Sequence, residues 1–270
     1  MKKENNIRYY FGKNWNSYSD QINRKKIEIS KNSITTMLGN VRGKDVLDIG
    51  CGSGIHAIAF LELGVKSIIC FDFDIDSVET TKKMINRYCK DFKNFLVLND
   101  DILNVKSKAL KKKKKFDIVY SWGVLHHTGN VKNAILKSFQ YVKKDGIFNL
   151  AIYNKTKLCK FWSWEKKMYS QYPIFRMFVK KPFFYFLLFG YCLKMRSTPK
   201  VVLNEYNKNR GMSLMHDVDD WLGGYPYESM SEEEINSLMS QNNFKIIKAE
   251  NVQKKIGIFG SGCSEWVVKK

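Results

Sequence analysis

The sequence has little proline, no closely spaced cysteine pair and no long apolar run, and each shortage excludes a class of protein. With 4 Pro and 17 Gly in 270 residues, disordered and collagen-like chains are excluded. The 6 Cys include no C-x-x-C pair, so we expect free thiols, no zinc site and no bound metal. The apolar run 183–193 is shorter than the about 20 residues that a membrane-spanning helix needs.

The N-terminus also lacks the apolar stretch of a secretory signal, since it reads MKKENNIRYYFGKNW. We therefore expect a cytoplasmic protein. Acidic residues are in the minority, and the formal charge is +20, yet only 7 of the 46 basic residues are Arg. Arg is favoured for bidentate phosphate contacts, so we interpret the lysines as a solvated surface and do not expect a nucleic-acid partner. They would still attract anionic molecules and membrane surfaces.

Short apolar runs alternate with helical patterns from residue 44 to residue 152, which is typical of repeated βαβ units. Strands are predicted at 46–49, 67–71, 95–98, 116–121 and 146–152, and helices at 55–63, 77–88 and 131–142. Such apolar strands must be covered on both faces, so we expect an α/β fold with a doubly wound, mainly parallel sheet. Ligands of these sheets bind at the carboxyl ends of the strands.

The last part of the chain is predicted to complete this sheet. Ser231 and Glu234 form a capping-box pattern at the start of a helix that ends near residue 242. Strands at 245–251 and 264–268 then form a hairpin, which would finish a seven-stranded sheet with an antiparallel edge. We expect three parts: a helical extension and cofactor lid at 1–40, a cofactor-binding domain at 41–154 and 230–270, and a helical cap with the acceptor site at 155–229.

A glycine loop follows the first predicted strand directly. Gly50, Gly52 and Gly54 remove Cβ atoms where the backbone must turn tightly and approach a ligand. The dinucleotide pattern G-x-G-x-x-G would need a glycine at Ile55, so a NAD-dependent oxidoreductase is disfavoured. Asp72 ends the second strand, where a carboxylate can accept both ribose hydroxyls of a nucleotide.

These motifs resemble those of the class I S-adenosylmethionine-dependent methyltransferases over nearly the whole chain. The matching segments are the glycine loop 47–54, Asp72, the strand-three turn 99–102, the strand-four segment 116–128 and the turn 143–146, where Lys-Lys-Asp-Gly replaces the usual Lys-Pro-Gly-Gly. The resemblance implies a Rossmann-like fold, S-adenosyl-L-methionine as cofactor and S-adenosyl-L-homocysteine as product. It assigns cofactor contacts to Phe11, Trp15, Asp48, Gly50, Cys51, Gly52, Ser53, Gly54, His56, Asp72, Phe73, Asp101, Ile102, Ser121 and Trp122.

Two of these assignments have alternatives. Asp101 is preferred for the adenine amine, and Asp100 stands one residue away. His56 lies on the first helical turn after the glycine loop and is equally compatible with a plain helix residue. The segment 11–15 is expected to close over the cofactor.

His126 and His127 follow the fourth predicted strand, over the expected position of the methyl group. Imidazole titrates near neutrality, so either side chain could act as base for a hydroxyl acceptor, and they are the candidate catalytic residues. The alternative is a structural role, because the resembling family carries this pair in enzymes with different acceptors.

The acceptor site is expected to lie between strand four, strand five and the stretch 210–225. The candidate acceptor-binding residues are Asn154, Arg210, His216, Trp221 and Tyr225. A structural loop in which Arg210 pairs with a nearby aspartate is the alternative. The aromatic, basic segment 155–200 is interpreted as a helical cap, with a lid over a lipophilic acceptor or a surface anchor as the alternative.

The predicted function is methyl transfer to oxygen or nitrogen of a small polar metabolite or sugar. The alternatives are a lipid or quinone methyltransferase in peripheral contact with the inner membrane face through 161–194, and an RNA methyltransferase or RNA-binding module. The absence of an Asn-Pro-Pro-Tyr-like motif at 121–123 argues against base methylation. The sequence does not indicate an oligomeric state.

Overall fold

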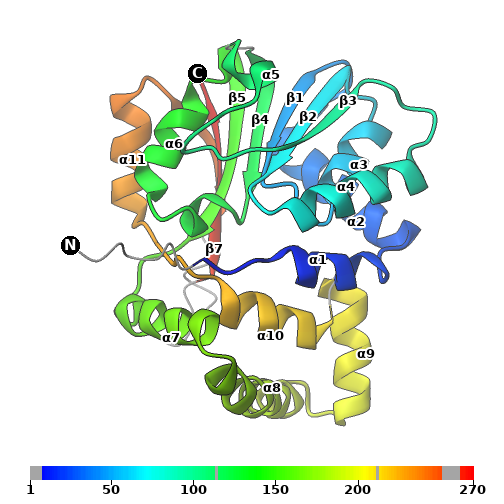
Figure 1. Ribbon diagram of the computed structural model, residues 1–270, viewed down its shortest axis with the longest axis vertical. Coiled ribbons are helices and arrows are strands. Elements are labelled where there is room, and N and C mark those ends of the chain that lie inside the picture. Colours follow the sequence, from blue (N-terminus) through cyan, green and yellow to red (C-terminus); the bar gives the residue numbers. More distant parts are fainter. Residues whose placement is uncertain (1–7, 113–114, 211–212, 251–261) are drawn as a thin grey trace.

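A computed structural model describes residues 8–112, 115–210, 213–250 and 262–270. Its centre is one seven-stranded sheet in the order β3-β2-β1-β4-β5-β7-β6 (Figure 1). The strands are β1 (Asp45–Ile49), β2 (Ser67–Asp72), β3 (Phe95–Asn99), β4 (Phe116–Trp122), β5 (Val142–Tyr153), β6 (Lys245–Glu250) and β7 (Cys263–Lys269). The first five strands pair in parallel. The predicted fold class, a mainly parallel sheet with an antiparallel C-terminal strand, is confirmed.

Two details of the prediction are wrong. The antiparallel strand β7 lies inside the sheet, between β5 and β6, and the edge strand β6 runs in the direction of the parallel strands. The helix predicted at 131–142 also ends early, because Val142 pairs with Phe116 and starts β5. Strand pairing therefore ends the helix before residues 141–142, which have high β-propensity.

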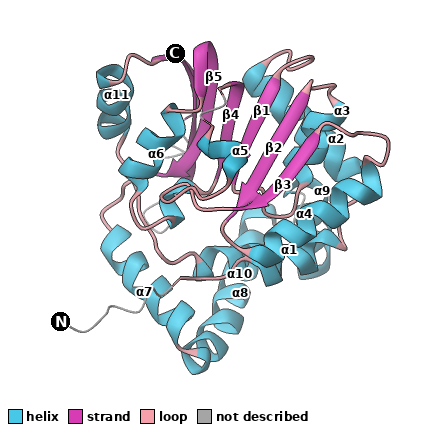
Figure 2. Ribbon diagram, turned by 45° about the horizontal axis from the view of Figure 1, so that its top comes forward, coloured by secondary structure: helices cyan, strands magenta, loops and turns pink. Residues whose placement is uncertain are grey.

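Helices cover both faces of the sheet, because successive strand residues point to opposite sides (Figure 2). Val46 packs in a core with α2 (Arg24–Leu38), α3 (Ile55–Glu62) and α4 (Ile75–Tyr88). Leu47 packs on the other face with α6 (Val131–Phe139) and α11 (Glu232–Gln241). The short α5 (Lys108–Lys111) contributes Leu110 to that second core. The doubly wound arrangement thus follows from strands that are apolar on both faces.

Four helices form the cap between β5 and α11: α7 (Cys159–Gln171), α8 (Pro173–Met195), α9 (Pro199–Arg210) and α10 (Leu214–Gly223). A single bridge between Asn154 and Met230 marks where the chain leaves the sheet and returns to it. The cap has small apolar cores of its own, one of them around Tyr169. Among the described residues, no helix combines the length and apolar character that crossing a bilayer requires.

The N-terminal helix α1 (Gly12–Ser19) lies between the sheet domain and the cap (Figure 1). It packs against α4 on one side and α10 on the other. The capping box at the start of α11 is present as predicted: Ser231 Oγ accepts from the Glu234 amide at 3.2 Å, and Glu234 Oε2 accepts from the Ser231 amide at 2.8 Å.

Candidate functional site

The glycine loop turns sharply at the carboxyl end of β1. Gly50, Gly52 and Gly54 have φ angles of +81°, +53° and +78°, a region that favours glycine. A Cβ on Gly50 would lie 2.4 Å from the Val124 side chain, and one on Gly52 would lie 3.2 Å from Nε1 of Trp15. The loop therefore needs glycine both for its backbone angles and for the close approach of its neighbours.

Asp72 lies beside this loop at the end of β2. Its Oδ2 accepts from the Gly52 amide at 3.0 Å, and its Oδ1 accepts from the Asp74 amide at 2.9 Å. Burial raises the pKa of Asp72 to about 6, the backbone amides of Asp74 and Gly52 lower it, and the charge of Asp74 raises it. Burial and the charge of Asp72 raise the pKa of Asp48 to about 7, and Oδ2 of Asp48 is buried without a hydrogen-bond partner. Two carboxyl groups with raised pKa values thus flank the loop, a pattern common at functional sites.

A cleft of about 700 Å³ opens beyond the end of β2, with Asp74 in its wall but neither Asp72 nor the glycine loop. Its size is typical of small-ligand sites. Its wall includes Phe73, Asn99 and Asp101 from the strand ends, and Arg8 from the N-terminal segment. The Arg8 guanidinium stacks on the Phe73 ring at 4.0 Å. Asp100 also lines the cleft, but its carboxylate accepts from three backbone amides, those of residues 101, 106 and 107. Asp101 is therefore the carboxylate better placed to meet a ligand.

Other residues assigned to the cofactor have different surroundings. Ile102 is buried in the sheet core with Leu47 and Phe71, so its side chain does not face the cleft. Ser121 donates to the carbonyl of Ile49 at 3.3 Å. The ring of Trp122 is 40% exposed, and its Nε1 donates to Glu265 at 3.1 Å.

The remaining positions around the loop are buried. Cys51 and Ser53 are 7% and 5% exposed, and burial raises the pKa of the Cys51 thiol. His56 packs edge-on against Tyr120 at 5.3 Å and Trp122 at 6.1 Å between ring centroids. Burial lowers its pKa to about 4, so His56 is neutral at pH 7.

The N-terminal segment contacts every part of the site. The Gly12 amide donates to Oδ2 of Asp74 at 2.7 Å, which fixes the start of α1 on the first turn of α4. Trp15 covers Gly52, and the ring of Phe11 lies 5.1 Å from that of His127. The Tyr9 amide donates to the Tyr225 carbonyl of the cap at 2.7 Å. In this conformation α1 covers the glycine loop.

The two histidines form the short 3₁₀ turn η1 (Leu125–His127) after β4. Nδ1 of His127 lies 2.9 Å from the carbonyl of Pro226, which can only accept, so Nδ1 carries the hydrogen and Nε2 the lone pair. Burial lowers the pKa of His127 to about 4. His126 is buried more deeply, its pKa is lowered by burial and by His127, and its Nδ1 has no hydrogen-bond partner.

The predicted acceptor residues are only partly brought together. Trp221 lies with its ring centroid 5.7 Å from Tyr153, whose ring is 3.9 Å from His126, so it faces the histidines. Asn154 is buried next to Tyr153, and its Oδ1 accepts from Ser264 at 2.6 Å while its Nδ2 has no partner. Tyr225 contributes its carbonyl to Tyr9, followed by a cis peptide bond to Pro226.

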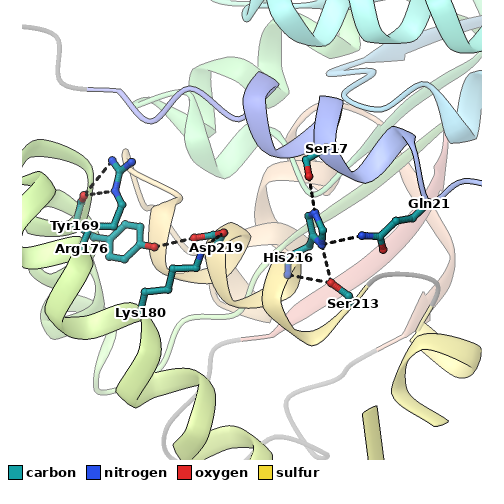
Figure 3. Close-up of polar contacts among 8 residues, drawn as sticks. All are labelled: Ser17, Gln21, Tyr169, Arg176, Lys180, Ser213, His216 and Asp219. Carbon is teal, nitrogen blue, oxygen red and sulfur yellow. Dashed lines mark hydrogen bonds and ion pairs between the residues drawn. The ribbon is translucent and has the colours of Figure 1, made fainter. Parts of the chain in front are cut away.

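Of the other two predicted acceptor residues, only His216 has a described side chain. His216 faces α1: its Nε2 is 3.1 Å from Ser17 Oγ, and its Nδ1 is 2.6 Å from Ser213 Oγ (Figure 3). Arg210 ends α9, and its side chain falls outside the described residues, as do Gly211 and Met212. The alternative in which Arg210 pairs with an aspartate is therefore not tested.

Sequence reasoning missed a buried charged pair on α7. Lys166 is fully buried, with Nζ 3.9 Å from the Trp221 ring and 5.3 Å from the Tyr227 ring, and it donates to the Trp221 carbonyl. Both carboxylate oxygens of Glu165 are buried without a hydrogen-bond partner. Burial raises the pKa of Glu165 and lowers that of Lys166. No sequence signal marks them, because adjacent charges on an amphipathic helix usually face solvent.

Together these side chains form an acceptor-side cluster, defined as Tyr153, Trp162, Lys166, Trp221 and Tyr227. The cap is held in place around it by polar contacts of Asp219 on α10, which accepts from Tyr169 on α7 at 2.9 Å and pairs with Lys180 on α8 at 2.5 Å (Figure 3). Tyr153 of this cluster contacts His126, and Val124, two residues before His126, lies close to Gly50 of the loop.

The chain is similar in sequence to curated methyltransferases. It is 25% identical over 232 residues to a ubiquinone biosynthesis O-methyltransferase of Rickettsia prowazekii, covering 83% of this chain and 84% of that protein. A protein of the same name from Rickettsia canadensis is 27% identical over 136 residues. That match covers 50% of this chain and about half, 54%, of the relative.

Solved structures share the fold at low identity. The magnesium protoporphyrin IX methyltransferase of Synechocystis, with bound S-adenosylhomocysteine, superimposes with a TM-score of 0.53 at 14% identity, over 93% of this chain and 84% of that one. The N-methyltransferase NodS of Bradyrhizobium japonicum gives 0.51 at 12% identity, over 92% and 97%.

The family comparison extends over most of the chain. A family model described as a methyltransferase domain matches residues 22–249, which include the glycine loop, Asp72, both histidines and the whole cap. The strand order agrees with the class I fold that the motifs resemble. The chain therefore belongs to the methyltransferase domain family, as a class I S-adenosylmethionine-dependent member.

Proposed function

We propose that the protein transfers the methyl group of S-adenosylmethionine to an oxygen or nitrogen atom of a small molecule that carries an aromatic ring. The cofactor would be held by the glycine loop, by Asp72 at its ribose and by Asp101 at its adenine. The observation that supports this placement is the Asp72 carboxylate, which is bonded to the loop at Gly52, while Phe73 and Asp101 line the 700 Å³ cleft beyond the end of β2. The unpartnered Oδ2 of Asp48 leaves a further acceptor for a cofactor donor.

The sulfonium of the cofactor already activates the methyl group, so the protein has to align the acceptor and manage its proton. His127 is neutral at pH 7, its hydrogen on Nδ1 is bound to the Pro226 carbonyl, and the Gly224 backbone is a further hydrogen-bonding neighbour of the ring. The lone pair of Nε2 is our candidate for taking the acceptor proton. His126 is buried against Tyr153 and is better suited to orienting its neighbour than to proton transfer.

The acceptor-side cluster supports the acceptor class that we propose. Four of its five side chains are aromatic, and Trp221 packs against Tyr153 and Trp162, so these side chains would suit a flat, apolar ring better than a sugar. Lys166 adds one buried cation, which would stabilise an acceptor hydroxyl as it loses its proton. Between the two acceptor classes predicted from sequence, this favours the lipophilic, quinone-like one. The curated relatives, named as ubiquinone biosynthesis O-methyltransferases, point the same way.

A panel of acceptors tests the proposal. Purified protein with S-adenosylmethionine is offered a catechol carrying an alkyl tail, a simple catechol, a hexose and an aliphatic amine, and methylated product and S-adenosylhomocysteine are measured by mass spectrometry. We expect the tailed catechol to be the best acceptor. Faster transfer to the hexose or to the amine would contradict the proposed class, and product formation without any dependence on the cofactor would contradict the reaction.

Two variants locate the chemistry in this cluster. Trp221→Ala and Lys166→Met should lower transfer by about 10- to 100-fold while the affinity for S-adenosylhomocysteine stays within a few fold, the pattern of lost acceptor contacts. The matched control is Trp164→Ala, since Trp164 is also on the cap but is 53% exposed. Equal losses in Trp164→Ala and Trp221→Ala would show that the cap acts only through its overall packing.

A further inference from the structure

Helix α8 carries large apolar side chains on two faces, together with the basic residues Arg176, Lys180, Lys181 and Lys194. One face packs inside the cap, where Phe175, Val179, Phe183 and Leu188 join the cores around Tyr169 and Val202. The opposite face, which we call the outer face of α8, is 64–71% exposed at every large apolar residue. Those residues are Ile174, Met177, Phe178, Tyr185, Phe186, Phe189 and Leu193. An exposed cluster of large apolar side chains usually marks an interaction site, and among the described residues this face has no covering partner.

Aromatic side chains of α7 are exposed as well. The ring of Trp164 is 53% exposed and lies 6.2 Å from Phe175 on the inner face of α8, and Phe161 is 50% exposed at 6.0 Å from Trp164. Both helices lie at the end of the molecule opposite α5 and the C-terminus, away from the sheet (Figure 1). Exposed aromatic side chains therefore occur on two neighbouring helices of the cap.

Charge of one sign surrounds these side chains. Glu165 is the single acidic residue in the sequence between 155 and 200, and it is buried. Exposed basic residues flank the apolar side chains: Lys160, Lys167, Lys181, Lys194 and Arg196. Lys180 forms an ion pair with Asp219 and is not counted among them. A second copy of this chain is poorly suited as partner, because a symmetric contact would bring lysine against lysine without acids to pair them.

We propose that the outer face of α8 is a docking surface for an anionic lipid membrane, in which the helix lies in the plane of the interface. Aromatic and aliphatic side chains together would enter the acyl boundary, while the flanking lysines would contact anionic headgroups. The exposed aliphatic residues Ile174 and Leu193 distinguish this surface from a platform for stacking nucleic-acid bases, which needs rings alone. The inference does not depend on which acceptor the enzyme methylates.

Flotation of the full chain tests the proposal. Vesicles of equal parts phosphatidylglycerol and phosphatidylcholine should carry the protein upward, vesicles of phosphatidylcholine alone should carry much less, and added salt should weaken binding. A triple variant, Phe178→Ser with Phe186→Ser and Phe189→Ser, should lose at least about tenfold in partitioning, because three rings are withdrawn from lipid. Its matched control is Phe92→Ser with Ile247→Ser, which are 37% and 50% exposed outside the cap.

A charge variant gives a second, independent measurement. Lys181→Glu with Lys194→Glu should reduce binding to the anionic vesicles by about fivefold or more per position, and the control Lys25→Glu with Lys132→Glu should reduce it much less. Calorimetry with S-adenosylhomocysteine on every variant shows that each is folded, and it separates failure of docking from failure of the proposed reaction.

Three outcomes would overturn the proposal. The first is equal flotation of the triple variant and its control. The second is a wild-type dimer in sedimentation that the triple variant converts to a monomer while neither binds vesicles, which would assign the face to a second copy. The third is binding of homopolymer RNA that only the triple variant loses, again without vesicle binding.

Discussion

Nε2 of His216 on α10 lies 3.1 Å from Oγ of Ser17 on α1, although 199 residues separate them in the sequence. The amide of Gln21 adds a contact to Nδ1 of the same ring at 3.4 Å. Because Trp15 of α1 covers Gly52, this ring links the cap directly to the helix that closes the glycine loop. The cap and the glycine loop are thus connected through α1.

Replacing His216 should loosen α1. In His216→Ala, loss of these contacts costs about 0.5–1.5 kcal/mol, so limited proteolysis near Trp15 should become about 2- to 10-fold faster. S-adenosylhomocysteine should slow cleavage in the wild type and less so in the variant. Gln241→Ala is the control, since it removes a hydrogen bond within α11, from Nε2 of Gln241 to Oγ of Ser237. Cleavage that neither ligand nor variant changes would make 11–15 a fixed structural arm.

Cofactor affinity should depend on pH through Asp72. Its pKa is raised to about 6, first by burial, and its carboxylate must be ionised to accept ribose hydroxyls. Affinity for S-adenosylhomocysteine should therefore be constant above about pH 7 and fall by up to about tenfold per pH unit below about pH 6. Asp72→Asn should bind more weakly at neutral pH and lose this dependence; calorimetry across the range measures both. An unchanged pH profile in Asp72→Asn would contradict the assignment.

A methyl group on Gly50 should be more costly than one on Gly43. Both residues have positive φ angles, +81° and +72°, but a Cβ on Gly43 meets nothing within 4 Å, whereas one on Gly50 meets Val124 at 2.4 Å. Gly43→Ala should cost about 1–2 kcal/mol in backbone strain, and Gly50→Ala a further 1–3 kcal/mol, roughly, in overpacking. Urea denaturation gives the difference. Equal costs would mean that Val124 moves aside freely.

Replacing one residue of the buried pair on α7 should lower the free energy of unfolding more than replacing both. Lys166→Met leaves the Glu165 carboxylate buried without a cation, which should cost about 1–3 kcal/mol near pH 8. Burial raises the folded pKa of Glu165 above its unfolded value, so stability is lost as pH rises through the folded pKa. The destabilisation caused by Lys166→Met should therefore shrink near pH 5. Adding Glu165→Gln should restore stability near pH 8. A double variant that is less stable than Lys166→Met would contradict this coupling.

The sequence by itself determined the sheet domain, because its signals are local. Strands that are apolar on both faces require helices on both sides, and the glycines at 50, 52 and 54 mark a turn that only small residues can make. Ser231 and Glu234 likewise specify the start of α11 within four residues. The strand order that places β7 inside the sheet is different, because it depends on pairing between segments more than 100 residues apart.

Only the tertiary structure determined which side chains of the cap come together. His216, expected at the acceptor, faces α1, while Glu165 and Lys166, which read as ordinary charges on a helix, are buried beside Trp221. A helical pattern shows which residues share a face but not what that face meets, and the cap offers four amphipathic helices with several ways to pack. Which charges are buried and which rings stay exposed, as on the outer face of α8, is therefore fixed by how those helices pack together and not by their individual patterns.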